Sequence, residues 1–177
     1  NQYYYKAQNF LGVIYYKGQY IEHDIDKAIY YLTLASNNND DYNDYNAAYT
    51  LGLIYFEGSY VKRDIKRSIH YLTIALKNDE KNAHSLLGII YLKGIDVDLD
   101  INKAIQYLTF ASNKNDFIAQ FLLGSIYFTG EFLSRDLNKA IYYFTLAANQ
   151  NIKEAQFSLG LIYFLGYDNP RDYKKSI

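Results

Sequence analysis

Three aspartates at alternating positions are the strongest hint of metal chemistry in this chain. Asp96, Asp98 and Asp100 alternate with apolar residues in the stretch IDVDLDINKA, as carboxylates do at the opening of a calcium-binding loop. A loop that began at Asp96 would need glycine at its sixth position and glutamate at its twelfth. Those positions hold Ile101 and Tyr107. The metal hypothesis therefore fails, and we predict no metal and no cofactor.

The residues that could support catalysis do not form a recognisable set. His23 is expected in a loop, His70 on one helix and His84 on the next. Packing could bring His70 near His84, but no carboxylate or serine recurs with them. The sequence has no glycine-rich phosphate loop, no Gly-x-Ser-x-Gly and no His-Glu-x-x-His. Its lack of cysteine removes disulfides, thiolate metal sites and cysteine nucleophiles together. We therefore predict that the chain is not an enzyme.

Composition excludes two further classes of partner. The 177 residues are 50% hydrophobic, 21% charged and carry a formal net charge of −1, so the chain can bury a core but offers no electrostatic surface for nucleic acid. No apolar run approaches the roughly 18 residues of a membrane span, so we predict no membrane insertion by this segment. The sequence leaves the compartment open, although the lack of cysteine favours a reducing one such as the cytoplasm over the endoplasmic reticulum lumen or secretion.

An internal repeat organises the whole chain. The pair Leu-Gly recurs with spacings of 40, 36, 36 and 36 residues, at Gly12, Gly52, Gly88, Gly124 and Gly160. A second glycine follows each of these by six residues, at Gly18, Gly58, Gly94, Gly130 and Gly166. An aspartate follows by another six, at Asp24, Asp64, Asp100, Asp136 and Asp172. Such register over five copies predicts a single repeat array, with repeats of approximately 1–37, 38–77, 78–113, 114–149 and 150–177.

Each repeat is expected to form two helices. The first helix carries segments such as AAYTLGLIYFEG and ends at a glycine suited to a left-handed cap. The second helix begins at the aspartate, which serves as N-cap, in segments such as DIDKAIYYLTLA. Asp100 is therefore a helix cap, while Asp96 and Asp98 lie in the connecting loop. The predicted fold class is an all-α solenoid of about five stacked antiparallel helix pairs.

The glycine of the Leu-Gly pair is expected inside the first helix and against a neighbour. Glycine costs a helix interior about 1 kcal/mol relative to alanine, so its recurrence indicates that a side chain there would collide with a packed helix. The tyrosine three residues later is expected to fill space between helices, at Tyr15, Tyr55, Tyr91, Tyr127 and Tyr163.

The combined pattern of Ala, Leu-Gly, Tyr, Gly, Asp-x-x-Lys-Ala and a distal Ala resembles the Sel-1-like repeat family, a relative of tetratricopeptide repeats. The resemblance covers essentially the whole chain, over four full repeats and part of a fifth. Tetratricopeptide repeats themselves have a period of about 34 residues and a late proline, whereas Pro170 is the only proline here. The resemblance implies a non-catalytic scaffold or adaptor that binds a protein or peptide. Alternatives are a structural spacer in a larger complex, or a luminal adaptor in endoplasmic-reticulum-associated degradation. A hydrolase is disfavoured, because the family members credited with that activity are rich in cysteine.

Two departures from the family pattern affect the loops. The second glycine of the usual Gly-x-Gly loop is replaced by Tyr20, Tyr60, Asp96, Phe132 and Asp168, and left-handed backbone angles are costly for bulky residues. The first repeat also carries four extra residues in the polar stretch NNNDDYNDYN, which we expect to be a lengthened solvent loop or, alternatively, an interaction element. Neither terminus shows the polar face of a capping repeat, so we expect a piece of a longer array.

The resemblance implies that the first helices line the concave face of the solenoid. The outward positions three residues before the repeat glycine are Asn9, Tyr49, Ser85, Phe121 and Phe157. Those five after it are Lys17, Glu57, Lys93, Thr129 and Leu165, and those six before it are Lys6, Asn46, Asn82, Ile118 and Glu154. The predicted binding residues are Tyr49, Phe121, Phe157, Asn9, Ser85, Glu57, Lys93 and Leu165. The three aromatic residues could anchor a peptide or a partner helix, or could instead pack against the first helix of the neighbouring repeat.

Overall fold

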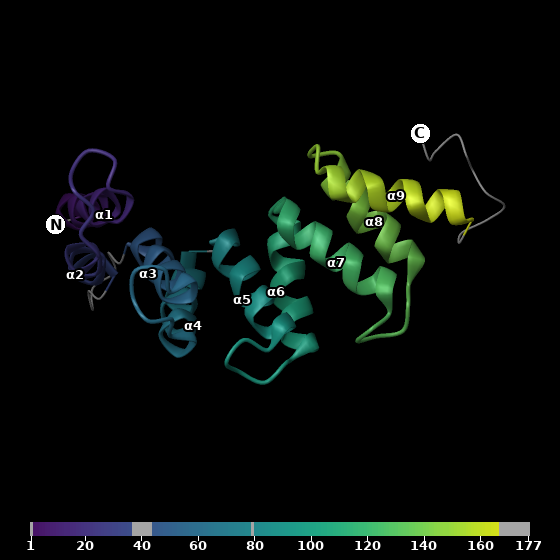
Figure 1. The fold of residues 1–177 in the computed structure, drawn as a ribbon, viewed down its shortest axis with the longest axis horizontal. Helices are drawn as coiled ribbons and strands as arrows, with labels where there is room; N and C mark the ends of the chain where they lie inside the picture. Colours follow the sequence, from purple (N-terminus) through teal and green to yellow (C-terminus); the bar gives the residue numbers. More distant parts are fainter. Residues whose placement is uncertain (1, 37–43, 79, 167–177) are drawn as a thin grey trace. The chain divides into compact units, whose positions relative to one another are not determined.

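The computed structural model describes residues 2–36, 44–78 and 80–166. Its elements are helices separated by short loops (Figure 1). In order they are α1 (Gln2–Lys17), α2 (Ile25–Ser36), α3 (Tyr45–Glu57), α4 (Ile65–Ala75), the short 3₁₀ helix η1 (Leu76–Asn78), α5 (Lys81–Lys93), α6 (Ile101–Asn113), α7 (Phe117–Thr129), α8 (Leu137–Ala148) and α9 (Lys153–Leu165). The predicted all-α fold of paired helices is confirmed. Within these ranges, no helix is long and apolar enough to cross a membrane.

The chain divides into two compact units. The N-terminal unit comprises residues 1–87 and 94–98, and the C-terminal unit comprises residues 88–93 and 99–177. In the N-terminal unit α1 packs on α2, α2 on α3 and α3 on α4. In the C-terminal unit α6 packs on α7, α7 on α8 and α8 on α9. Each unit thus repeats the same alternation of first and second helices. The lengthened segment expected within 37–46 lies mostly outside the described residues.

The predicted helix ends are confirmed where the structure describes them. Asp64, Asp100 and Asp136 are the N-caps of α4, α6 and α8, and each carboxylate accepts the backbone N–H three residues on. Gly58 and Gly130 end α3 and α7 in the left-handed conformation, which glycine adopts without steric cost. The sequence therefore specifies where each helix pair starts and turns.

Close approach at the repeat glycine is also confirmed. A Cβ built on Gly52 would lie 2.7 Å from Cγ of Leu72, and one on Gly88 would lie 2.6 Å from Cγ of Leu108. In the second repeat the hydroxyl of Ser68 donates a hydrogen bond to the carbonyl of Gly52 at 2.7 Å. The backbone of the first helix at the glycine therefore lies directly against the leucine side chain of the second helix, and no room is left for a methyl group.

The repeated tyrosines lie between the two helices of their own repeat, as predicted. Four of them stack on a tyrosine of the second helix with ring centroids 5.9 Å apart, in the pairs Tyr15–Tyr31, Tyr55–Tyr71, Tyr91–Tyr107 and Tyr127–Tyr143. Burial raises the pKa of the second-helix members Tyr107 and Tyr143. These rings are therefore structural spacers.

The backbone of the loops differs between repeats at the position where the family pattern has its second glycine. Of the described non-glycine residues, those with positive φ are Asp96, Asn115 and Asn151. Asp96, which stands where the family pattern has glycine, adopts φ 51°. A short polar side chain tolerates this backbone angle better than a bulky one does. Tyr20, Tyr60 and Phe132 follow a different backbone path, so the loops of the repeats are not identical.

Candidate functional site

Two of the three predicted outward registers are exposed in every repeat. The residues six before the repeat glycine (Lys6, Asn46, Asn82, Ile118 and Glu154) are all exposed, as are those five after it (Lys17, Glu57, Lys93, Thr129 and Leu165). Positions 11 residues apart lie on one side of a helix, because about three turns separate them. We call these ten residues the first-helix face.

The register three before the repeat glycine behaves differently. Asn9, Tyr49 and Phe121 are half-buried, Ser85 is buried and Phe157 is exposed. This register lies about 60° around the helix from the first-helix face at 100° per residue, so it meets whatever packs beside the helix. The five side chains predicted there do not form a uniform surface.

In the N-terminal unit, two predicted binding residues join neighbouring first helices. The amide of Asn9 on α1 donates to the carboxylate of Asp44 at 3.0 Å, and Asp44 is the N-cap of α3. The hydroxyl of Tyr16 on α1 donates to Glu57 at the end of α3 at 2.8 Å. Burial and then the Glu57 carboxylate raise the pKa of Tyr16. Asn9 and Glu57 are therefore engaged in holding α1 against α3.

In the C-terminal unit, Phe121 packs inside its own repeat. Its ring centroid lies 5.7 Å from that of Phe144 on α8, and Phe128 lies 6.2 Å from the same ring. Phe144 is 1% exposed and belongs to the core that Phe121 flanks. We expected this side chain either to anchor a partner or to pack on a neighbouring first helix. The described contact is with the second helix of the same repeat.

A shallow groove runs along α9 in the same unit. It is lined by Gln156, Phe157, Gly160, Leu161 and Phe164. Phe157 is 73% exposed and Phe164 is 54% exposed. We call these five residues the α9 groove. Of them, only Phe157 was predicted as a site residue. Phe164 occupies the same place in the repeat as Phe128, which is half-buried and packs against the core around Phe144.

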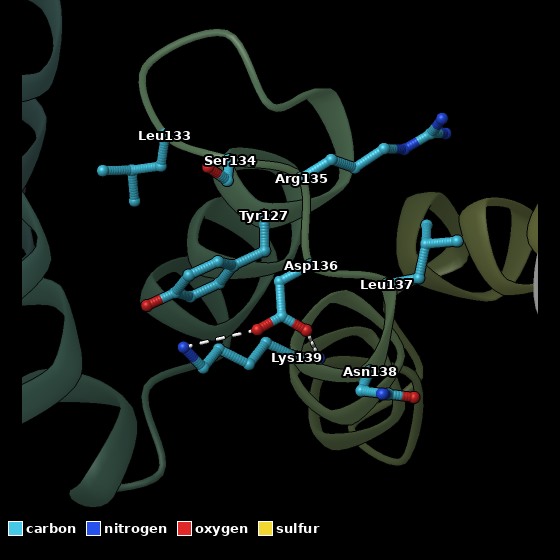
Figure 2. A pocket seen from close by; sticks show the side chains of 8 residues that line it. All are labelled: Tyr127, Leu133, Ser134, Arg135, Asp136, Leu137, Asn138 and Lys139. Carbon is cyan, nitrogen blue, oxygen red and sulfur yellow. Dashed lines mark hydrogen bonds and ion pairs between the residues drawn. The ribbon is translucent and has the colours of Figure 1, made fainter.

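A pocket lies at the loop between α7 and α8, and its polar lining residues contact one another (Figure 2). Asp136 accepts the backbone N–H of Lys139 at 3.0 Å, and its second oxygen pairs with the Lys139 ammonium at 3.4 Å. That ammonium lies 4.8 Å from the centre of the Tyr127 ring. The Lys139 backbone N–H, and after it the Lys139 side chain, lower the pKa of Asp136. Both carboxylate oxygens of Asp136 therefore have partners within the protein. The residues of this pocket hold the loop between α7 and α8 in place and are not free to bind a ligand through Asp136.

The same closure recurs at the other helix pairs. Asp24 and Asp100 are paired with Lys27 and Lys103, and the pKa of each of these two carboxyls is lowered first by the backbone N–H of its lysine. In the second repeat Arg67 pairs with Asp64 at 3.4 Å. These recurring acids are therefore committed to helix capping.

Among the residues that the structure describes, the three histidines lie apart and contact aromatic rings or backbone. The ring of His23 lies against that of Tyr60, with centroids 4.1 Å apart and the planes tilted by 37°. Nδ1 of the buried His84 lies 3.0 Å from the carbonyl oxygen of Glu80. His70 is exposed and its ring centroid lies 5.2 Å from that of Tyr71. Across residues 2–36, 44–78 and 80–166, no group of three or more His, Cys, Asp or Glu side chains could hold a metal ion.

A buried amide cluster was not anticipated from the sequence. Gln120 on α7 is 1% exposed, and its side chain donates to the carbonyl of Ser112 at 3.4 Å and to Asn115 at 3.3 Å. Gln150, beyond α8, donates to Gln120 at 2.8 Å. The first and fifth repeats also carry glutamine four residues before the repeat glycine, at Gln8 and Gln156, and this recurrence is the signal from which the position could have been found. The cluster links successive helical hairpins of the C-terminal unit.

Comparison with known proteins supports the repeat assignment. The family model described as the Sel1 repeat matches residues 6–40, 46–80, 81–116, 118–152 and 153–177. No curated protein sequence matches the chain.

Solved structures are similar over most of the chain. A Sel1 repeat protein from Oxalobacter formigenes is 29% identical, with coverage of 97% of this chain and 69% of that one and a TM-score of 0.82. The protein c5321, a protective antigen of uropathogenic Escherichia coli strains, is 27% identical, with coverage of 97% of this chain and 38% of that one and a TM-score of 0.87. Cysteine-rich protein B of Helicobacter pylori is 25% identical, with coverage of 78% and 96% and a TM-score of 0.56.

The predicted class, an all-α helical repeat solenoid of about five repeats, is confirmed by the family match. The chain belongs to the Sel1 repeat family of tetratricopeptide-like helical repeat proteins.

Proposed function

We propose that this chain is a non-catalytic scaffold that binds a protein or peptide through its first-helix face. One observation carries the proposal. The positions that build the helix pairs repeat nearly unchanged, whereas the exposed positions of the first-helix face differ in chemistry from repeat to repeat. Apart from Glu57, which accepts the hydrogen bond of Tyr16, these exposed side chains differ from repeat to repeat, so a partner can recognise them individually. Proteins of this repeat family typically bind other proteins, which supports the same conclusion.

The chemistry of the face suggests how a partner would bind. In α1 and α3 of the N-terminal unit it presents Lys6, Lys17, Asn46 and Glu57, which suit polar and charged contacts. In α7 of the C-terminal unit it presents Ile118, which is 43% exposed, and in α9 it presents Leu165, which is 45% exposed. Single exposed apolar residues are ordinary on a protein surface. We therefore assign Ile118 and Leu165 the role of anchors as parts of the whole first-helix face, with its polar residues, and not as sites by themselves.

Charge introduced into the apolar part of the face tests the proposal. We would combine Ile118→Lys with Leu165→Lys and identify bound proteins by affinity capture and mass spectrometry. The matched control is Tyr142→Lys on α8, which is 59% exposed and lies on a second helix. We expect specific partners to be kept by the wild type and the control and lost by the face variant. Partners that are lost equally from both variants, or from neither, would contradict binding through the first-helix face.

A further inference from the structure

The segment from Lys62 to Arg67, between α3 and the first turn of α4, is the most basic stretch of the sequence. Four basic residues and one aspartate give it a formal charge of +3, whereas the matching segments 22–27, 98–103 and 134–139 of the first, third and fourth repeats carry −2, −1 and +1. Those repeats form their helices without this charge. The positive charge of the second repeat is therefore not a requirement of the fold.

This basic segment lines an open pocket in the N-terminal unit. The pocket has a volume of about 720 Å³, within the range of sites that hold small ligands or peptide side chains. Its apolar lining includes Ile29 of α2 and Val61, which are half-buried. Its charged lining consists of the four basic residues together with Asp26, Asp64 and Asp96. We call it the basic pocket.

The two arginines of the basic pocket are held by contacts within the protein. Nε of Arg63 lies 3.6 Å from the carboxylate of Asp96. Arg67 pairs with Asp64 at 3.4 Å and donates a hydrogen bond to the hydroxyl of Tyr55 at 3.4 Å. The carboxylate of Asp64 also accepts the backbone N–H of Arg67 at 2.9 Å, so the N-terminus of α4 is already capped. An anion in this pocket would therefore have to be held by side chains.

The two lysines of the basic pocket are not committed in this way. Lys62 and Lys66 are both exposed, and in the part of the chain that the structure describes neither makes an ion pair or a hydrogen bond through its side chain. They stand two residues before and two residues after the cap Asp64. The basic pocket therefore offers two available ammonium groups beside an apolar lining.

The fourth repeat has the matching pocket without these two ammonium groups. At the loop between α7 and α8, Ser134 and Asn138 take the places of Lys62 and Lys66 (Figure 2). That pocket keeps the aspartate cap and the stacked tyrosine of its repeat. The helix pair thus closes in the same way with serine and asparagine at these positions, and the two lysines are an addition specific to the second repeat.

We propose that the basic pocket is a docking site for an acidic peptide segment of a partner protein. Carboxylates of the segment pair with Lys62 and Lys66, and an apolar side chain between them contacts Ile29 and Val61. Complementary charge of this kind guides a partner to one place on a surface. The pocket's own three carboxylates disfavour a compact anion of high charge such as phosphate, whereas carboxylates spaced along a peptide can meet each lysine separately. This site is separate from the first-helix face.

Titration with a short acidic peptide tests the proposal. A fluorescein-labelled Glu-Glu-Leu-Glu-Glu peptide is added to the wild type at low salt and followed by anisotropy, with Gln-Gln-Leu-Gln-Gln as the neutral probe. We expect saturable binding of the acidic peptide alone. Lys62→Ser with Lys66→Asn copies the fourth repeat, and should weaken binding about tenfold by removing two exposed ion pairs. Asp26→Asn removes a repelling charge from the lining and should strengthen binding.

The matched control removes two positive charges from another surface. Lys6→Ser with Lys17→Asn changes the net charge equally but lies on the first-helix face of α1, where both lysines are exposed. We expect it to change the affinity for the acidic peptide by less than about twofold, because exposed charges farther away are largely screened. Absence of saturable binding, equal weakening by both lysine pairs, or indifference to the pocket pair would overturn the proposal.

Two measurements on the wild type alone complete the test. Inorganic phosphate is added to the bound peptide, with sodium chloride of equal ionic strength as the reference. If only phosphate displaces the peptide, the pocket is a phosphate site and the peptide assignment is wrong. The acidic peptide is also made with a photoreactive phenylalanine in place of leucine, and its cross-links are mapped by mass spectrometry. We expect adducts at Ile29 or within residues 61–67, and adducts confined to the first-helix face would overturn the proposal.

Discussion

A methyl group added at Gly52 should reveal how tightly the helix pairs are built. Leu72, directly opposite, is 0% exposed. A Cβ on Gly52 would lie 2.7 and 2.8 Å from two of its carbon atoms and 3.3 Å from its backbone nitrogen. The hydrogen bond from Ser68 to the Gly52 carbonyl, 2.7 Å long, ties the same two helices together. The helices therefore cannot separate to admit the methyl without losing this bond.

The expected magnitude follows from two opposing effects. Alanine stabilises a helix interior by about 1 kcal/mol relative to glycine. An extra methyl in a filled core costs about 1 to 3 kcal/mol. We expect Gly52→Ala to lower the free energy of unfolding by about 1 kcal/mol, the difference between these typical values. The measurement is urea denaturation followed by far-ultraviolet circular dichroism, with Asn46→Ala on the same helix as an exposed control that should change stability by less than about 0.5 kcal/mol.

A double-mutant cycle separates the clash from other causes. Leu72→Ala alone should cost about 3 kcal/mol, as large-to-small core changes do. In that background the methyl on residue 52 has room, so Gly52→Ala should raise stability by about 1 kcal/mol. The pair would then be coupled by about 2 kcal/mol, within the range seen for residues in contact. If Gly52→Ala stabilises the wild-type background, or changes stability equally in both, the close-approach argument is refuted.

Two further predictions concern polar contacts. The pKa of Asp136 is lowered in the folded protein, first by the Lys139 backbone N–H, so its stabilisation is complete above the unfolded value of about 4 and is lost as pH falls through the folded pKa. Asp136→Asn should therefore shrink the loss of Tm on acidification, and an identical acid profile for both proteins would contradict this. Tyr16→Phe removes the 2.8 Å hydrogen bond to Glu57 and should cost about 1 kcal/mol. In a Glu57→Gln background part of that cost should remain, because the neutral amide oxygen still accepts the hydrogen bond of Tyr16. If the stability effects of Tyr16→Phe and Glu57→Ala are fully additive, the two residues do not interact.

Local rules allowed the sequence to predict most of the fold. The aspartate caps, the left-handed glycines and the glycine–leucine contact all depend on interactions within about 20 residues, and each is visible in the repeat. Asp96 shows the limit, because its positive φ could not be told from the sequence alone when other repeats place tyrosine or phenylalanine there.

The candidate site was harder to predict, because outward positions on a helix depend on its neighbours. Helical geometry placed Ile118 and Leu165 correctly in exposed registers. It could not show that Phe121 packs on Phe144, since that contact depends on the distance and angle between two helices. Nor could it foresee the bond between Asn9 and Asp44, which joins successive repeats.

Site-specific cross-linking would test the binding role of the first-helix face most directly. A photoreactive amino acid is placed at position 118 on the first-helix face, or at position 142 on α8, and the chain is irradiated in its native extract. We predict that a defined protein is captured from position 118 and not from position 142, and that Leu165→Lys abolishes its capture. Capture of the same proteins from both positions, or from position 142 alone, would contradict the proposed scaffold function of this face.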